Sequence, residues 1–309
     1  MFKLPTRKTP ILCQGITTEM GLIHTEQAIA YGSHIVAGTS RDKSVRCYQD
    51  IPVFQTVREA VRKTKPAVSV IFATPARALA EVEEAVKAKI PMIVCTTEHV
   101  PLHDMLKMVS LTRDKGITFI GPSSTGIVRT GECLVGSLPA HLFPKGRIGI
   151  IGRSSSLVYE AVQQLAEEGL GVSTCVSLGA AMWIGLDFVP VWEALTADKK
   201  TDVVLVVGQK TGEAELDLAM AYRQAKHRKP LIVYIPDQTT ADNMPRSFSK
   251  IPFVQPADVL HDKRVALEKA GAVWVERVSE LGRTVALALT QHPKHRVRVS
   301  DKGDIPAEK

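Results

Sequence analysis

The chain of 309 residues lacks several features that would place it in a specialised class of protein. It has no run of eighteen apolar residues, so we expect no membrane span, and its first residues lack the apolar core of a signal peptide. Aromatic residues are only 5% and do not alternate with basic ones, so we expect no nucleic-acid partner. The 45% apolar and 23% charged residues are ordinary for a folded protein, and we expect a cytoplasmic location.

Cysteine is scarce, and its spacing shows no paired motif. The five cysteines are odd in number and form no CxxC pair, and Cys13, Cys95 and Cys175 lie in apolar runs typical of buried strands. This usage predicts a reducing compartment in which cysteines act as small apolar residues. No group of His, Cys, Asp or Glu has the spacing of metal ligands, so we predict no metal site.

The order of apolar segments predicts two α/β domains. In the first half we expect strands at 10–14, 34–37, 68–72, 92–95 and 117–120, with helices at 20–31, 56–62, 76–88 and 102–115 between them. The second half repeats this order, with strands at 148–151, 173–176, 203–207, 231–235 and 273–275 and helices at 157–168, 191–198, 213–227, 260–270 and 280–289. Short strands alternating with helices predict parallel sheets. We place the domains at 1–140 and 145–290, their boundary within 136–146, and a flexible basic tail at 291–309.

The turn after the first strand is the first candidate site. It runs Gln14-Gly15-Ile16-Thr17-Thr18-Glu19-Met20-Gly21, where a doubly wound sheet meets its ligand and free helix amides can hold a pyrophosphate. The spacing is not GxGxxG, which disfavours a standard NAD enzyme. A tight turn with glycine at both ends explains the same residues equally well.

The loop after the second strand carries cations. NAD enzymes place an acid there to bind ribose hydroxyls, whereas this chain has Gly38-Thr39-Ser40-Arg41-Asp42-Lys43. Two cations suit a phosphorylated ribose, such as that of coenzyme A, and a solvated loop is the alternative. The net charge of +7 is likewise compatible with a phosphorylated ligand or with an ordinary solvated surface.

In the second half, Gly152-Arg153-Ser154-Ser155-Ser156 joins a strand to a helix. Serine hydroxyls and free amides at a helix start suit a phosphate, although an ordinary serine N-cap has the same appearance.

Several longer stretches resemble the alpha subunit of succinate–CoA ligase. They include Cys13-Gln14-Gly15, His24-Thr25-Glu26-Gln27-Ala28-Ile29-Ala30-Tyr31-Gly32, Pro52-Val53-Phe54, Gly131-Glu132-Cys133, Tyr159-Glu160-Ala161-Val162 and Ala266-Leu267-Glu268-Lys269-Ala270-Gly271. The likeness covers about residues 9–290. It implies a Rossmann-like domain that binds coenzyme A, followed by a flavodoxin-like domain.

The resemblance also implies partners and contacts. A beta-type ATP-grasp subunit would hold ATP or GTP with Mg, and a small carboxylic acid would be joined to coenzyme A. The family's coenzyme-A contacts fall on Thr17, Thr18, Glu19, Met20, Lys43, Thr96, Thr97 and Glu98. Its phosphate and substrate contacts fall on Ser154, Ser155 and Tyr159. Thr17-Thr18-Glu19-Met20 replaces the family's Thr-Gly-Ser-Gln, and a carboxylate beside a pyrophosphate is repulsive, so we expect weak binding.

The family's phosphohistidine is missing by this comparison. Phe248 falls at its position, and Gln209 falls at the glutamate that supports it. Phenylalanine has no nucleophilic atom, and among the other histidines His261 is the one candidate for a substitute. We therefore expect an alpha-subunit-like component of an NDP-forming acid–thiol ligase. The alternatives are a phosphorylation-dead coenzyme-A-binding or regulatory paralogue, and a ligase that passes an acyl phosphate directly to coenzyme A.

Overall fold

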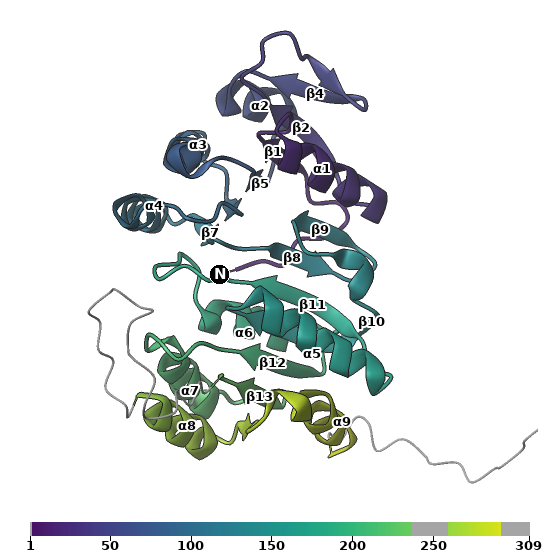
Figure 1. The fold of residues 1–309 in the computed structure, drawn as a ribbon, viewed down its shortest axis with the longest axis vertical. Coiled ribbons are helices and arrows are strands. Elements are labelled where there is room, and N and C mark those ends of the chain that lie inside the picture. The colour runs from purple at the N-terminus through teal and green to yellow at the C-terminus, as the bar shows by residue number, and fades with distance from the viewer. Residues whose placement is uncertain (1, 237–258, 292–309) are drawn as a thin grey trace, which may run out of the picture.

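The computed structural model describes residues 2–236 and 259–291, which form two sheets stacked along the long axis of the molecule (Figure 1). The first sheet has the strand order β3-β4-β2-β1-β5-β6-β7. Its strands are β1 (Ile11–Gln14), β2 (Ile35–Thr39), β3 (Cys47–Tyr48), β4 (Ile51–Phe54), β5 (Val68–Ile71), β6 (Met92–Cys95) and β7 (Thr118–Ile120). All neighbours are parallel except β3 and β4.

Four helices belong to the first sheet. They are α1 (Glu19–Tyr31), α2 (Val57–Thr64), α3 (Pro75–Lys87) and α4 (Leu102–Asp114). One face is covered by α2, α3 and α4, through buried residues such as Ala60, Val82 and Met108. The opposite face meets α1, and α1 also contacts β9 of the second sheet. Helices on two faces of a parallel sheet leave the strand ends free to form a site.

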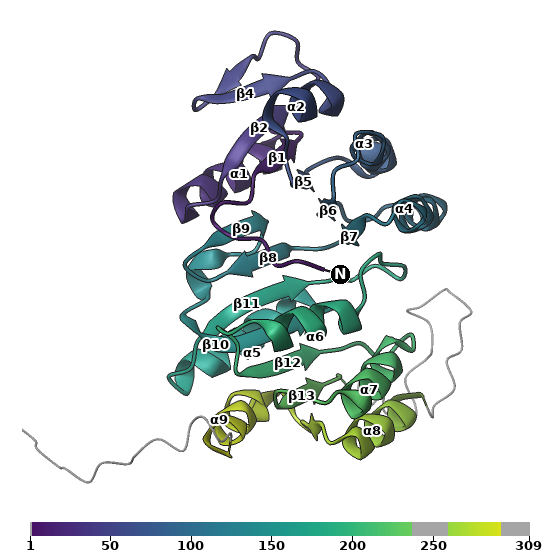
Figure 2. The same ribbon diagram turned by 180° about the vertical axis from the view of Figure 1, so that it is seen from behind.

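The second sheet has the order β14-β13-β12-β10-β11-β8-β9. Its strands are β8 (Gly126–Arg129), β9 (Cys133–Gly136), β10 (Lys145–Gly152), β11 (Val172–Ser177), β12 (Val203–Val207), β13 (Leu231–Tyr234) and β14 (Val273–Trp274). Its α-helices are α5 (Ser155–Glu167), α6 (Phe188–Ala197), α7 (Ala214–Gln224), α8 (Val259–Ala270) and α9 (Leu281–Gln291), and short 3₁₀ turns occur at Ala140–Leu142 and Val278–Glu280. Helices α5 and α9 pack together, whereas α6, α7 and α8 form a separate row, as seen from behind in Figure 2.

The expected strands and helices within the described residues are present, with ends shifted by a few residues. Four strands were not expected, namely β3, β4, β8 and β9. In the first sheet β3 runs antiparallel to β4, and in the second β8 runs antiparallel to β11 and to β9, so both sheets are mixed rather than wholly parallel. The chain thus enters the second sheet at Gly126, before the segment 136–146 where we place the domain boundary. That boundary stays a prediction, and the tail at 292–309 lies outside the described residues.

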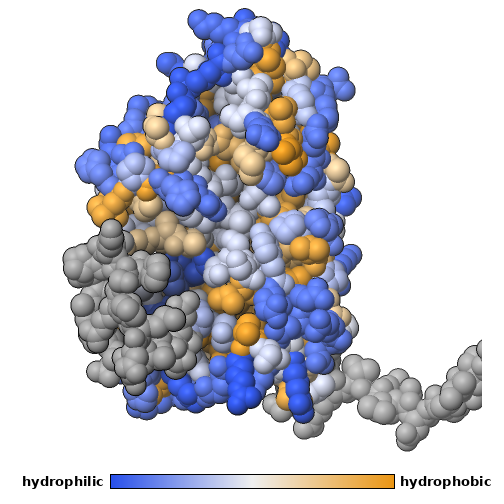
Figure 3. Space-filling view, in the orientation of Figure 1, coloured by the Kyte–Doolittle hydropathy of each residue, from blue (hydrophilic) through white to orange (hydrophobic). Residues whose placement is uncertain are grey.

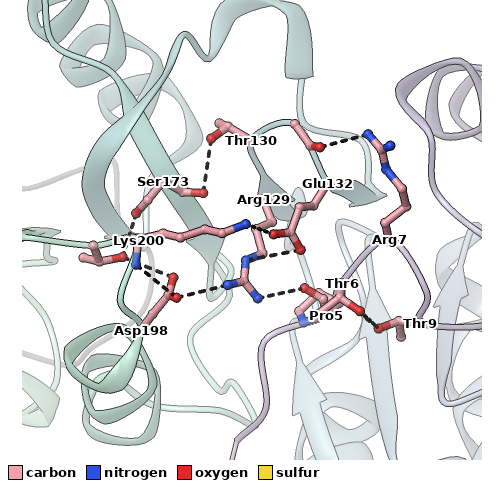
Figure 4. A network of polar contacts seen from close by, with 12 residues as sticks. Pro5, Thr6, Arg7, Thr9, Arg129, Thr130, Glu132, Ser173, Asp198 and Lys200 are labelled. Atoms are coloured by element: carbon pink, nitrogen blue, oxygen red, sulfur yellow. Dashed lines mark hydrogen bonds and ion pairs between the residues drawn. The ribbon is translucent and has the colours of Figure 1, made fainter.

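The N-terminal segment, which leads into the first sheet, forms hydrogen bonds with residues of the second sheet (Figure 4). Arg129 is 3.4 Å from the carbonyl oxygen of Pro5 and 3.1 Å from the Asp198 carboxylate, and both contacts are hydrogen bonds donated by its guanidinium group. Glu132 pairs with Arg129 and with Lys200. These contacts join residues far apart in sequence, so they fix the N-terminal segment against the second sheet.

Four of the five cysteines are buried and all five are free thiols. Burial raises the pKa of Cys13 and of Cys133 to about 12 and that of Cys95 to about 11, because a thiolate is poorly solvated there. The expected burial of Cys13, Cys95 and Cys175 is confirmed. Among the described helices, none combines the length and apolar character that crossing a membrane requires. On the face shown in Figure 3, apolar side chains gather in small groups between polar ones.

Candidate functional site

The turn between β1 and α1 is held in shape by glycine. Gly15 has φ +80°, and a Cβ atom built there would lie only 2.2 Å from the carbonyl oxygen of Phe72. A Cβ on Gly21 would lie 2.0 Å from the carbonyl oxygen of Gly15. The chain therefore needs glycine at both positions to bring the first turn of α1 against the ends of the strands.

The threonine of the turn caps the helix. The Thr18 hydroxyl accepts a hydrogen bond from the Gly21 amide at 3.0 Å and donates one to the carbonyl oxygen of Gly15 at 2.8 Å. The Thr17 hydroxyl lies 2.7 Å from that of Ser40, which follows β2. Glu19 is exposed in the first helical turn, where a carboxylate interacts favourably with the helix dipole.

A cavity of about 430 Å³ opens beside this turn, at the carboxyl ends of β1, β2 and β5. Its lining residues come from the turn, the end of β2 and the loop after it, the segments just before α2 and α3, and helix α3 itself. They are Gly15, Thr17, Thr18, Thr39, Ser40, Arg41, Asp42, Gln55, Thr56, Phe72, Ala73, Thr74, Arg77, Glu81 and Glu84. A second cavity of about 220 Å³ shares Thr18 and Thr74 with the first and adds Glu19, Met20 and Thr96. The two adjoining cavities follow the strand ends, which is where a doubly wound sheet binds its ligand.

Most of the predicted coenzyme-A contacts meet at these cavities, and some do not. Thr17, Thr18, Glu19, Met20 and Thr96 line one or both. Thr97 is buried and donates a hydrogen bond to the carbonyl oxygen of Ala73 at 3.0 Å, so its hydroxyl supports the neighbouring chain.

Two of the three charged residues of the prediction lie apart from the cavity walls. Lys43 and Glu98 are exposed, and both lie outside the described lining of the two cavities. Arg41, from the same loop as Lys43, is the cation of this loop that lines the larger cavity.

Sequence analysis missed three charged residues of helix α3 that line the larger cavity. Arg77, Glu81 and Glu84 follow one another at one-turn spacing along α3, and Glu81 accepts hydrogen bonds from the Arg77 guanidinium at 2.8 Å and from the Gln14 amide at 3.0 Å. The spacing of Arg77 and Glu81 places both on one face of the helix, and their position just after β5 was the signal available in the sequence.

A second group of predicted residues meets around the start of α5. The Ser154 hydroxyl accepts from the Leu157 amide at 3.5 Å, so it caps the helix, and Ser155 begins it. Tyr159 is half-buried, and burial raises the pKa of its phenol while the neighbouring Thr125 hydroxyl acts in the opposite direction. Tyr159 thus lies against the segment 123–126.

Arg153 holds the loop at 179–181 beside this helix. Its guanidinium is buried and donates to the carbonyl oxygens of Gly179 and Ala181, both at 2.7 Å. The Ala180 amide donates to the carbonyl oxygen of Ser123 at 3.1 Å. Burial lowers the pKa of Arg153, and the nearby carboxylates of Glu215 and Asp187 oppose the shift. The loop at 179–181 therefore packs against Ser123 and against Arg153, just before the start of α5.

Gln209 lies in a loop held by a buried ion pair. Lys263 and Glu215 are no more than 1% exposed, and Lys263 Nζ lies 2.7 Å from Glu215 Oε2. Glu215 Oε1 accepts from the Gln209 amide at 2.8 Å, and Lys263 donates to the Gln209 carbonyl oxygen at 2.7 Å. The Gln209 side-chain oxygen is buried without a hydrogen-bond partner among the described residues. Sequence analysis did not single out Lys263 or Glu215.

Phe248 lies outside the described residues, so its place relative to Gln209 is not described. His261 lines a separate cavity of about 250 Å³ with Lys210, Arg264 and Glu276. The described ranges 2–236 and 259–291 contain no group of three or more His, Cys, Asp or Glu that could hold a metal ion.

The fold is an α/β architecture of two sheets with cavities at the strand ends of the first, and the sequence of that first part matches a coenzyme-A-binding domain. Residues 6–99 match the family model of the CoA binding domain, and residues 145–288 match that of the succinyl-CoA ligase like flavodoxin domain. ADP-forming succinate–CoA ligase alpha subunits from Staphylococcus aureus and Staphylococcus epidermidis are 33% and 32% identical over 279 residues. These alignments cover 90% of this chain and 92% of each relative. The chain belongs to the family of succinate–CoA ligase alpha subunits.

Solved structures share the fold at lower identity. ATP citrate lyase from Methanothrix soehngenii, in complex with citrate and coenzyme A, matches with a TM-score of 0.80 and 18% identity over 98% of this chain and 53% of that one. The dinucleotide forming acetyl-coenzyme A synthetase 1 of Ca. Korarchaeum cryptofilum matches with a TM-score of 0.72 and 18% identity over 91% of this chain and 61% of that one. This chain thus spans about half to three fifths of the length of those proteins.

Proposed function

We propose that this chain is the coenzyme-A-binding, alpha-type component of an NDP-forming acid–thiol ligase that works with a nucleotide-binding beta subunit. The observation that carries the proposal is the cavity at the ends of β1, β2 and β5, inside the segment that matches the CoA binding domain. Its substrate would be a small carboxylic acid, as for the succinate–CoA ligase relatives.

The residues present fit coenzyme A in part. The glycine turn, the Thr17 and Thr18 hydroxyls and the start of α1 offer hydrogen-bond donors and a helix N-terminus to a pyrophosphate. The Thr18 hydroxyl already caps Gly21, so it would share its hydrogen bonds with a ligand. Coenzyme A itself supplies the thiol that accepts the acyl group, and this chain's residues would bind and orient it.

The second part of the proposal concerns the phosphoryl carrier. With Phe248 at the phosphohistidine position of the resemblance and Gln209 at its supporting glutamate, we propose that no phosphohistidine forms on this chain. Two hypotheses remain for such a protein. It is either a phosphorylation-dead coenzyme-A-binding or regulatory paralogue, or a ligase that passes the acyl phosphate directly to coenzyme A.

Calorimetry with coenzyme A tests the first part. We expect weak but measurable binding, with an affinity reduced in a Thr17→Val variant, because that change removes a hydroxyl from the cavity without changing the size of the side chain much. A chain that gives no heat with coenzyme A at about millimolar concentration, a range equivalent to about 4 kcal/mol of binding free energy, would refute coenzyme-A binding.

Labelled ATP tests the second part. The chain is co-expressed with a beta subunit from the same genome, purified by size exclusion and incubated with ATP carrying a labelled γ-phosphate. We expect co-elution with the beta subunit and no acid-labile, base-stable phosphate on this chain. Elution of the chain alone contradicts the partner, and a labelled histidine contradicts the loss of the carrier. Acyl-CoA formation without labelled histidine favours direct transfer over the regulatory paralogue.

A further inference from the structure

The charges around the larger cavity oppose the ligand proposed for it. Among the described residues of its lining, Arg41 and Arg77 are cations, whereas Asp42, Glu81 and Glu84 are anions. Coenzyme A carries a 3′-phosphate and a pyrophosphate, so an excess of carboxylates in the wall weakens its binding unless a cation is released to the ligand.

Glu81 is the carboxylate that holds both of these cations. Its Oε1 atom accepts from Arg77 at 2.8 Å and lies 3.4 Å from the Arg41 guanidinium, while its Oε2 accepts from the Gln14 amide at 3.0 Å. The Glu81 side chain is only 13% exposed, and Gln14 is fully buried at the end of β1. The carboxylate is therefore fixed, and the cations are arranged around it.

The two arginines are held unequally. Arg77 lies one helical turn before Glu81 on α3, so its pair is local, and its side chain is 36% exposed. Arg41 comes from the loop after β2, makes the longer contact, and is 63% exposed. A long, exposed arginine with one long contact can turn toward another acceptor at little cost.

Arg41 also lies near the end of β2, a position that Rossmann-type domains use to recognise the ribose. It lies two residues after Thr39, the last residue of β2, and Rossmann-type domains select the substituents of the ribose at this strand end. Guanidinium groups bind phosphate through two parallel hydrogen bonds, which a lysine cannot do.

We propose that Glu81 limits the affinity of this cavity for a phosphorylated ribose, because it competes with the ligand's phosphate for Arg41. This inference rests on the proposed coenzyme-A site and names the residues that set its strength. Arg41 is the cation that moves between the two acceptors, and Lys43 contributes only from outside the cavity.

The test is a double-mutant cycle measured by calorimetry on the full chain. The proteins are the wild type, Glu81→Gln, Arg41→Gln and the double variant, each titrated with coenzyme A and with 3′-dephospho-coenzyme A at low salt. Glu83→Gln is the matched control, because Glu83 lies on the same helix and pairs with Lys107 and Lys87 away from the cavity. Thermal unfolding verifies that each variant is folded.

We expect Glu81→Gln to raise the affinity for coenzyme A roughly two- to five-fold, the range of an exposed ion pair. The affinity for 3′-dephospho-coenzyme A should rise less. In the Arg41→Gln background the same change should bring no gain, and Glu83→Gln should leave the affinity unchanged. An equal gain in both arginine backgrounds, an equal gain for both ligands, or no gain at all overturns the role of Glu81. Absence of coenzyme-A binding in all five proteins refutes the proposed function itself.

Discussion

The buried pair of Lys263 and Glu215 allows a quantitative test of what holds the Gln209 loop. Lys263 Nζ is 2.7 Å from Glu215 Oε2 and donates to the Gln209 carbonyl oxygen at 2.7 Å, and both charged side chains are at most 1% exposed. Replacing Lys263 with methionine fills a similar volume but leaves the Glu215 carboxylate buried without its countercharge.

The expected loss of stability follows from this isolation. Breaking a buried ion pair by removing one partner costs about 3–5 kcal/mol in free energy of unfolding, because the remaining charge is buried from water and has lost its direct partner. For a domain of 150–250 residues each kcal/mol lowers Tm by about 2–4 °C, so Lys263→Met should lower it by roughly 6–20 °C. Urea unfolding followed by circular dichroism gives the free energy, and differential scanning fluorimetry gives Tm.

Two further variants make the test specific. Lys263→Met combined with Glu215→Leu removes both charges, so its cost should fall below the sum of the single changes by more than about 1 kcal/mol. Arg264→Gln is the matched control, because this next residue of α8 forms solvent-exposed pairs with Glu268 at 3.1 Å and with Glu276, each of which contributes at most about 1 kcal/mol. A Lys263→Met protein as stable as the control, or additive single changes, would refute the reasoning.

Three other outcomes are expected. Gly15→Ala should lower the free energy of unfolding in urea by about 2 kcal/mol or more, because its Cβ would lie 2.2 Å from the Phe72 carbonyl oxygen. Gly169 also has a positive φ (+68°) but open space around it, so Gly169→Ala should cost only about 1 kcal/mol. Equal costs would contradict the steric argument. Titration of the native protein with a thiol reagent near pH 8 should modify Cys47 alone, because the four buried thiols have raised pKa values or no access to solvent. A second fast-reacting thiol would contradict this prediction. Lys43→Ala should weaken coenzyme-A binding by at most about 1 kcal/mol at low salt and less at high salt, as judged by calorimetry, since the residue is exposed; a larger loss would place it in direct contact.

The order of strands and helices, and the location of the strand-end turns, could be predicted from the amino-acid sequence alone. This succeeded because buried parallel strands are short apolar runs, as in Val203–Val207, and because caps such as Thr18 and Ser154 are local signals. The resemblance to the succinate–CoA ligase alpha subunits likewise rests on local motifs, and the family is confirmed.

Which of these segments contact one another depends on the tertiary structure. Strand β8 pairs antiparallel with β11, whose residues lie about fifty positions further along the chain, and no local signal specifies that pairing. The same holds for the side chains of the site. Glu81 contacts Arg41, forty residues away in the sequence, and Lys263 of α8 contacts Glu215 of α7. Both contacts depend on how the elements that carry these residues pack together. A sequence shows a charge and its helix face, but whether that charge lines a cavity or lies buried beside a counterion depends on which elements pack against that face.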